Sequence, residues 1–207
     1  MKRFLMALAL LAGLTGFAGV AGTATASETK LLPEAPMGDD GLHKEPWMRD
    51  TFKDLREDLA EANAEGKRLV LLVEQRGCIY CKKMHEEVFV RPELHDYIAE
   101  NYFVVQLNLH GNDSATDFDG EEMEQTAMLR KWGILFTPTL IFLPEAVEEG
   151  KTAPQAAVAT MPGAFGFQTT LDMFTWVREK RYELDNGEDF QRYHARMIDE
   201  RRKKAGE

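Results

Sequence analysis

The sequence contains little cysteine, no excess of positive charge and only a single long apolar run. Its 207 residues include 25 Lys and Arg against 35 Asp and Glu, which gives a formal net charge of −10 at pH 7. Nucleic acid and anionic membranes are bound through positive charge, so this balance argues against both as partners. With 2 cysteines in all, no second cysteine pair exists to complete a four-ligand zinc site. No internal repeat is visible, and the length suits one domain with its own core.

The single long apolar run lies at the N-terminus. Residues 2 and 3 are basic, residues 4–20 are apolar and rich in glycine and alanine, and residues 24–26 are small. This is the pattern of a cleavable signal peptide, and the repeated glycines weaken the alternative of an uncleaved membrane anchor. We therefore expect residues 1–26 to direct export and to be removed. The membrane is then involved only in export.

The rest of the chain is expected to form a flexible N-terminal linker over residues 27–44 and one domain over residues 45–204. Proline, glycine and aspartate without periodicity are typical of a linker. In the domain, apolar residues at steps of three and four predict a first helix that begins near Pro46. The residues that recur at this spacing are Phe52, Leu55, Leu59 and Ala62, and Gly66 ends the run.

The later elements alternate between strands and helices. Apolar runs predict strands at 69–73, 103–109 and 139–143, with a hairpin partner for the last at 156–160. Asp119 and Glu122 resemble a capping box for a helix that runs to Lys131. The order predicts an α/β fold, with a central mixed sheet flanked by helices, an N-terminal helix and an extra C-terminal helix.

Cys78 and Cys81 stand two residues apart, between the apolar run at 69–73 and a stretch with helical character. A C-x-x-C motif at the junction of a strand and a helix indicates dithiol–disulfide chemistry. A bond between the two cysteines would close a very short loop and stabilise the fold only weakly through chain entropy. The alternatives are an inert structural bond or part of a zinc site, to which His85 could add a third ligand at most.

The position of each cysteine predicts its role. Cys78 is expected at the N-terminus of the helix, where unpaired backbone N–H groups and the helix dipole favour a thiolate. Cys81 lies one turn further into the helix. We therefore predict that Cys78 is the nucleophile and that Cys81 is the thiol that resolves the mixed disulfide.

This motif, the order of elements and a later Thr137-Pro138 resemble the thioredoxin superfamily, which implies a thioredoxin-like fold. Between residues 69 and 143 the chain is similar, more narrowly, to the SoxW-type periplasmic thioredoxins of bacterial sulfur oxidation. The matching stretches are Glu74-Gln75, Gly77-Cys78-Ile79-Tyr80-Cys81, Met84-His85-Glu86, and those at 105–109, 116–120, 131–133 and 136–139.

The resemblance implies how a substrate would bind. In that superfamily a cis proline lies opposite the active cysteine, which assigns this position to Pro138. The backbone of Thr137 would then pair with an extended segment of the substrate. Ile79 and Tyr80 replace the Gly-Pro of general thioredoxins and are candidate contacts to a partner, with simple surface exposure as the alternative for Tyr80.

The chain also departs from the superfamily beneath the cysteines. Thioredoxins carry a buried aspartate there, and the matching residue is Leu72; the accompanying lysine is replaced by Gln106. Glu74 lies two residues further along the same strand face and is the only carboxylate nearby. Our hypothesis is that Glu74 assists proton transfer at Cys81 with a raised pKa. The alternative is a partly solvated or hydrogen-bonded residue at the end of the strand.

The resemblance implies a monomeric periplasmic thiol–disulfide reductase without metal, whose redox centre is the Cys78–Cys81 disulfide alone. Electrons would come from a membrane thiol reductant of the CcdA/DsbD type and pass to a disulfide-bearing protein of the thiosulfate-oxidising system. One alternative is a general oxidase or isomerase of folding proteins; another is a metal-binding or metal-delivery module. The polar loop at 110–120 is either a rim that restricts partners or a plain insertion.

Overall fold

A computed structural model describes residues 30–185 and 187–206 of the chain. The predicted signal peptide lies outside these residues. Among the helices that are described, none has both the length and the apolar character needed to cross a bilayer.

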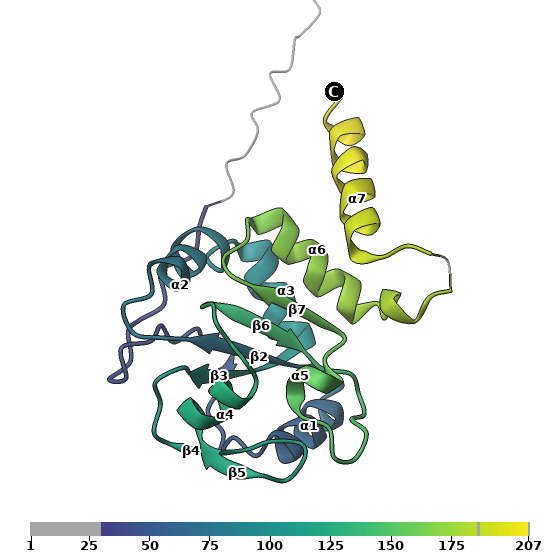
Figure 1. Ribbon diagram of the computed structural model, residues 1–207. Coiled ribbons are helices and arrows are strands. Elements are labelled where there is room, and N and C mark those ends of the chain that lie inside the picture. The colour runs from purple at the N-terminus through teal and green to yellow at the C-terminus, as the bar shows by residue number, and fades with distance from the viewer. Residues whose placement is uncertain (1–29, 186, 207) are drawn as a thin grey trace, which may run out of the picture.

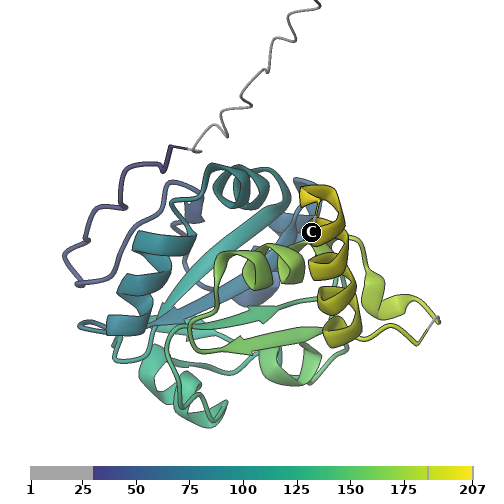
Figure 2. The same cartoon turned by 90° about the horizontal axis from the view of Figure 1, so that it is seen from above.

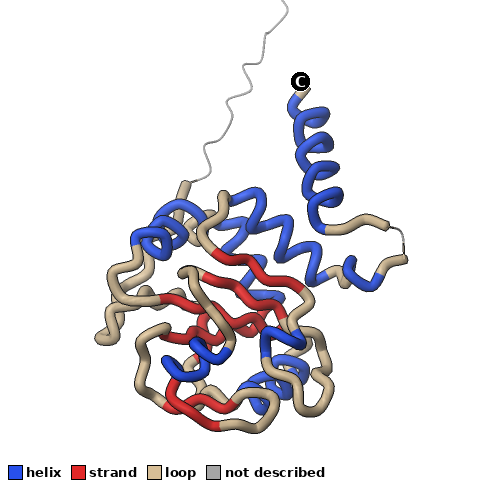
Figure 3. Tube along the Cα trace, in the orientation of Figure 1, coloured by secondary structure: helices blue, strands red, loops and turns tan. Residues whose placement is uncertain are grey.

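The core of the fold is a five-stranded mixed sheet with the strand order β1-β3-β2-β6-β7 (Figures 1 and 3). β2 pairs in parallel with β3 and antiparallel with β6, while β1 and β7 form the edges. The sheet is therefore mixed, as predicted. The strands are β1 (Met48–Arg49), β2 (Arg68–Glu74), β3 (Tyr102–Asn108), β6 (Thr139–Phe142) and β7 (Ala159–Pro162).

Helices cover both faces of this sheet, which confirms the predicted α/β layers. In Figure 1, α3 and α6 lie on one face, and α1, α4 and α5 lie on the other. α7 packs against α6, and Figure 2 shows it from above at the C-terminal end of the chain. The helices are α1 (Leu55–Ala64), α2 (Ile79–Lys83), a π-helix (Met84–Val88), α3 (Pro92–Asn101), α4 (Gln125–Lys131), α5 (Ala153–Ala156), α6 (Phe167–Arg178) and α7 (Phe190–Ala205).

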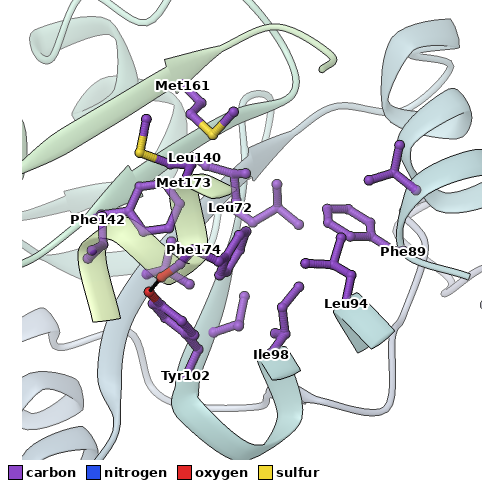
Figure 4. Close-up of a cluster of buried hydrophobic side chains, with 14 of the residues drawn as sticks. Leu72, Phe89, Leu94, Ile98, Tyr102, Leu140, Phe142, Met161, Met173 and Phe174 are labelled. Carbon is purple, nitrogen blue, oxygen red and sulfur yellow. Dashed lines mark hydrogen bonds between the residues drawn. The ribbon is translucent and has the colours of Figure 1, made fainter. Parts of the chain in front are cut away.

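β2 is buried along its whole length because its alternating side chains enter two separate cores. Leu72 belongs to the core beneath α3 and α6, where it lies near Phe142 and Phe174 (Figure 4). Leu71 and Val73 belong to the opposite core, with residues of α1 and α4. The strand is thus fixed from both sides, and its C-terminal end holds the redox motif in place.

Two predicted helix starts differ from the structure. α1 begins at Leu55, because the Asp54 side chain accepts a hydrogen bond from the Arg56 N–H and caps the helix there. Phe52 lies outside the helix and is 96% exposed, so its assignment to the helical spacing was wrong. The capping box at Asp119 was also wrong: Glu122–Glu124 forms a short strand, β5, that pairs with β4 (Ser114–Thr116), and α4 begins only after it.

The hairpin partner of β6 lies slightly later than predicted. Residues 153–156 form α5, in which Thr152 and Gln155 make a reciprocal capping box. β7 therefore starts at Ala159 and pairs antiparallel with β6.

The prediction of a flexible linker is corrected for residues 36–44, which form a hairpin against the domain. Met37 pairs with His43, and the Gly38 N–H donates to the Leu42 carbonyl at 2.8 Å. Leu42 is buried, and the Arg76 guanidinium donates to the carbonyls of Asp39 and Asp40. The buried Leu42 side chain and the Arg76 guanidinium thus hold against the domain a segment whose sequence has no helical or strand periodicity. We call residues 36–44 the N-terminal hairpin.

Candidate redox site

The two cysteines are joined in a disulfide, with their Cα atoms 5.2 Å apart. Gly77 makes the turn between β2 and the helix. Its φ of +70° lies in the left-handed region, where a residue with a side chain would be strained. Cys78 is the N-cap of α2, and its Sγ accepts a hydrogen bond from the Cys81 N–H at 3.0 Å. Cys78 is half-buried, whereas Cys81 is only 3% exposed. The sulfur that a partner can reach is therefore that of Cys78.

Thr137, which directly precedes Pro138, lies against Cys78. The peptide bond between Thr137 and Pro138 is cis. The Thr137 hydroxyl donates to Cys78 Sγ at 3.3 Å, and the Thr137 carbonyl oxygen lies 3.4 Å from the same sulfur. The second contact is no hydrogen bond in this state, since a disulfide sulfur carries no proton. Thr137 thus contacts the sulfur through both its side chain and its backbone.

An exposed apolar rim surrounds the disulfide. Ile79 and Tyr80 are 72% and 58% exposed, so both predicted contact residues are accessible. A groove of about 290 Å³ runs between them and the Thr137 loop, and it is lined by two further exposed side chains, Leu135 and Phe136. The sequence reasoning missed this pair, although it directly precedes the Thr137-Pro138 motif.

Glu74 is buried, at 1% exposure, so it is not the partly solvated residue of the alternative, but it is hydrogen-bonded at the end of β2, as that alternative also allowed. Its Oε2 accepts a hydrogen bond from Gln106 Nε2 at 2.6 Å, and its Oε1 lies 3.0 Å from His85 Nε2. Together with Cys78 and Cys81 it lines a cavity of about 140 Å³. The carboxylate and the inner cysteine therefore face the same space.

His85 is a buried residue beside the redox motif whose surroundings the sequence did not predict. Its side chain is fully buried; Nε2 faces Glu74, and Nδ1 lies 2.8 Å from Glu45 Oε1. Burial alone would lower the pKa of His85, but hydrogen bonds to Glu45 and Glu74 and the charges of both carboxylates outweigh it and raise the pKa to about 9. His85 is thus an imidazolium held between two carboxylates.

The N-terminal hairpin forms one wall of the cavity and joins this network. His43 stacks on His85 with 4.4 Å between ring centroids. Burial and the neighbouring charge of His85 lower the pKa of His43. Lys44 Nζ donates to Gln106 Oε1 at 2.6 Å. A lysine therefore reaches this region as in thioredoxins, but it is Lys44 of the N-terminal hairpin, because the matching position in β3 is Gln106.

The geometry does not support His85 as a third metal ligand beside the cysteines. Both ring nitrogens are already engaged by carboxylates. In residues 30–185 and 187–206, no group of three or more His, Cys, Asp or Glu side chains is arranged to hold a metal ion.

The loop at 110–120 is anchored by Asp117. This buried carboxylate accepts hydrogen bonds from Trp132 Nε1 at 2.7 Å and from the Ala153 N–H at 2.9 Å. At the start of the loop, His110 Nε2 lies 3.1 Å from Gln75 Oε1, next to the redox motif. The loop is thus tied to the domain at one end and reaches the site at the other.

Replacing Thr137 by valine should slow the alkylation of reduced Cys78 by iodoacetamide at pH 6 about tenfold, because the thiolate loses a hydrogen-bond donor. Stopped-flow or mass-spectrometric rates measure the effect. Thr175→Val is a matched control, since this hydroxyl donates to the Leu171 carbonyl within α6. Equal rates for Thr137→Val and the wild type would show that the hydroxyl does not act on Cys78.

Comparison with known proteins agrees with the thioredoxin-like fold described above. A family model described as a thioredoxin-like domain matches residues 55–163. A thioredoxin-fold protein from Helicobacter pylori is similar with a TM-score of 0.50 and 14% identity, over 77% of this chain and 88% of that one. None of the curated proteins matches the sequence.

Two further solved structures are similar at lower scores. A thioredoxin from Thermus thermophilus has a TM-score of 0.46 and 19% identity, over 60% of this chain and 84% of its own. The oxidised C-terminal domain of DsbD from Neisseria meningitidis has a TM-score of 0.40 and 17% identity, over 61% of this chain and 97% of its own.

Proposed function

The chain belongs to the thioredoxin-like domain family and is a thiol–disulfide oxidoreductase, and we propose that it works as a periplasmic reductase of protein disulfides. The observation that carries the proposal is the asymmetry of the pair: Cys78 is half-buried at a helix N-terminus and touches Thr137, while Cys81 is buried behind it. An accessible thiolate with a resolving thiol in reach is what disulfide exchange requires.

The reaction would proceed in two displacements. The Cys78 thiolate attacks one sulfur of a substrate disulfide, and the other substrate sulfur leaves with the bonding electron pair and takes up a proton. Cys81 then loses its proton and attacks Cys78 Sγ, which forms the Cys78–Cys81 bond and releases the second substrate thiol. Two electrons pass to the substrate, and its two released sulfurs take up their protons from solvent. A membrane thiol reductant of the CcdA/DsbD type then restores the dithiol.

The exposed rim suits an extended polypeptide segment as substrate. Such a segment would lie in the groove beside Cys78, along the backbone of Thr137 and Pro138 and against the apolar side chains of Ile79 and Tyr80. Backbone pairing gives affinity with little dependence on side chains, and pockets between apolar residues add selectivity. Glu74 is the group we propose to take the proton of Cys81, since the two share the cavity.

The resemblance to SoxW-type thioredoxins between residues 69 and 143 supports a partner in the thiosulfate-oxidising system. A Cys81→Ser variant expressed in the native host tests this, because it holds its partner in a disulfide with Cys78. We expect a component of the sulfur-oxidising system among the trapped proteins, and Cys78→Ser/Cys81→Ser as the control should trap none. Recovery of only general folding substrates would assign the protein to oxidation or isomerisation of folding proteins.

A further inference from the structure

A buried charged cluster lies beneath the redox motif and extends beyond Glu74. It contains Glu74 at the end of β2, His85 on the π-helix and Glu45 immediately after the N-terminal hairpin, and each of these side chains is at least nine-tenths buried. The two contacts of His85, at 2.8 Å and 3.0 Å, join the two carboxylates through one imidazole ring. The three groups therefore form one hydrogen-bonded unit.

The hydrogen-bond pattern fixes the charge of this unit. An imidazole can donate from both ring nitrogens only when it is protonated, and each ring nitrogen of His85 faces a carboxylate oxygen. One cation between two carboxylates leaves a single net negative charge in the protein interior. A net charge in the interior is costly unless it is paired and hydrogen-bonded, and here both carboxylates contact the same imidazolium.

The same cluster borders the space in front of Cys81. Glu74 and Cys81 both line the 140 Å³ cavity, which is large enough for water to bridge them. Gln106 donates to Glu74 and accepts from Lys44, so the amide is oriented with its donor toward the carboxylate. Glu74 is thus held from two sides at the edge of the cavity.

We propose that Glu45, His85 and Glu74 form the proton store of the redox site, in which Glu74 exchanges the proton of Cys81 and His85 and Glu45 are positioning residues. This inference rests on the proposed function. During resolution the S–H bond of Cys81 breaks and its proton passes to Glu74; the freed electron pair forms the bond to Cys78 while the Cys78–substrate S–S bond breaks, and its electron pair leaves with the substrate sulfur. Solvent in the cavity then takes the proton up from Glu74, so that the oxidised protein again holds the His85 imidazolium between two carboxylates. When the disulfide is reduced, Glu74 passes a proton from solvent back to the Cys81 sulfur.

Other titratable and charged groups face the cluster. His43 stacks on His85, Glu86 acts on His43 through its charge, and Lys44 pairs with Asp40. Removing a member of the cluster should therefore move the proton affinity of the unit in a direction set by the charge that is removed. Loss of the His85 cation should raise that affinity, and loss of the Glu45 anion should lower it.

The test follows the reaction of the reduced protein with 5,5′-dithiobis(2-nitrobenzoate) in a stopped-flow instrument between pH 5 and 9. The first thiolate released reports attack by Cys78, and the second reports resolution by Cys81. Glu74→Gln should slow the second phase about a hundredfold, as expected for loss of a general base. The midpoint of the second phase should shift up by about one pH unit in His85→Gln and down by about one in Glu45→Gln.

The control is His194→Gln, which breaks a comparable His–carboxylate pair with Asp172 between α6 and α7 and should leave both phases unchanged. Glu45→Gln keeps the test decisive if His85→Gln does not fold, because it leaves His85 paired with Glu74, whereas His85→Gln leaves two buried carboxylates without their cation. Midpoints that stay at the wild-type value, or that move in the same direction in both variants, would overturn the proton store. Loss of the first phase in the wild type would instead overturn the proposed function.

Discussion

Reduced protein carrying Cys78→Ser should show no turnover with a protein disulfide, whereas Cys81→Ser should react once and then stop. The reason is the difference in access and electrostatics. Cys78 is half-buried, caps a helix and receives the Thr137 hydroxyl, while Cys81 is buried inside the first turn. Only Cys78 can therefore meet a partner as a stabilised thiolate.

Insulin reduction driven by dithiothreitol measures the turnover, and mass spectrometry of the protein after mixing with a disulfide measures the adduct. We expect the rate of Cys78→Ser to fall to that of dithiothreitol alone, and Cys81→Ser to accumulate one stable mixed disulfide per molecule. The double variant provides the baseline. An adduct that forms as fast on Cys81 in Cys78→Ser as on Cys78 in Cys81→Ser would reverse the assigned roles.

The free energy of unfolding of the oxidised protein should fall by about 3 kcal/mol as the pH rises from 6.5 to 9, through His85. Its pKa is 6.5 in the unfolded chain and about 9 in the folded protein, and a tenfold difference in proton affinity corresponds to about 1.4 kcal/mol. Because the folded state binds the proton more tightly, this stability is fully present below pH 6.5 and is lost as the pH passes 9. Burial also raises the pKa of Asp58, to about 6, but that titration lies mostly below the window.

Urea unfolding at a series of pH values tests this, with His85→Leu as the variant. The variant should lose the pH dependence between 6.5 and 9. It should also be less stable than the wild type by about 3–5 kcal/mol at pH 6.5, since two buried carboxylates are left without their cation. His194→Gln is again the control and should keep the slope. A wild-type stability that is flat from pH 6.5 to 9 would show that His85 is not held as an imidazolium.

Local sequence patterns predicted the parts of the fold that depend on local physics. The apolar run at 69–73 fits a central strand buried on both faces, and the structure confirms this strand and the helix that begins directly after Cys78. Phe52 and Asp119 show where such patterns fail. The spacing between Phe52 and Leu55 fits a helix, but the Asp54 cap makes α1 begin only at Leu55. Asp119 and Glu122 fit a capping box, but the pairing of β4 with β5 makes residues 122–124 a strand.

The buried cluster could not be predicted because its members are far apart in the chain. Glu45 and His85 are separated by 40 positions, and neither stands in a pattern that points to the other. Glu74 was found because it shares a strand face with the position of the missing aspartate. The partners of Glu74 could be identified only from the packing of the N-terminal hairpin. This hairpin has too few apolar residues for the sequence to predict a folded segment.

The N-terminal hairpin also has a consequence for how this redox centre can be altered. The family match covers residues 55–163, and Glu45 and Lys44 lie outside it. A domain cut to the family limits would keep both cysteines, Thr137 and Pro138, yet lose the outer half of the charged network. The surroundings of Glu74 and His85 therefore depend on a short upstream stretch that lies outside the family match, while the C-x-x-C motif lies inside it.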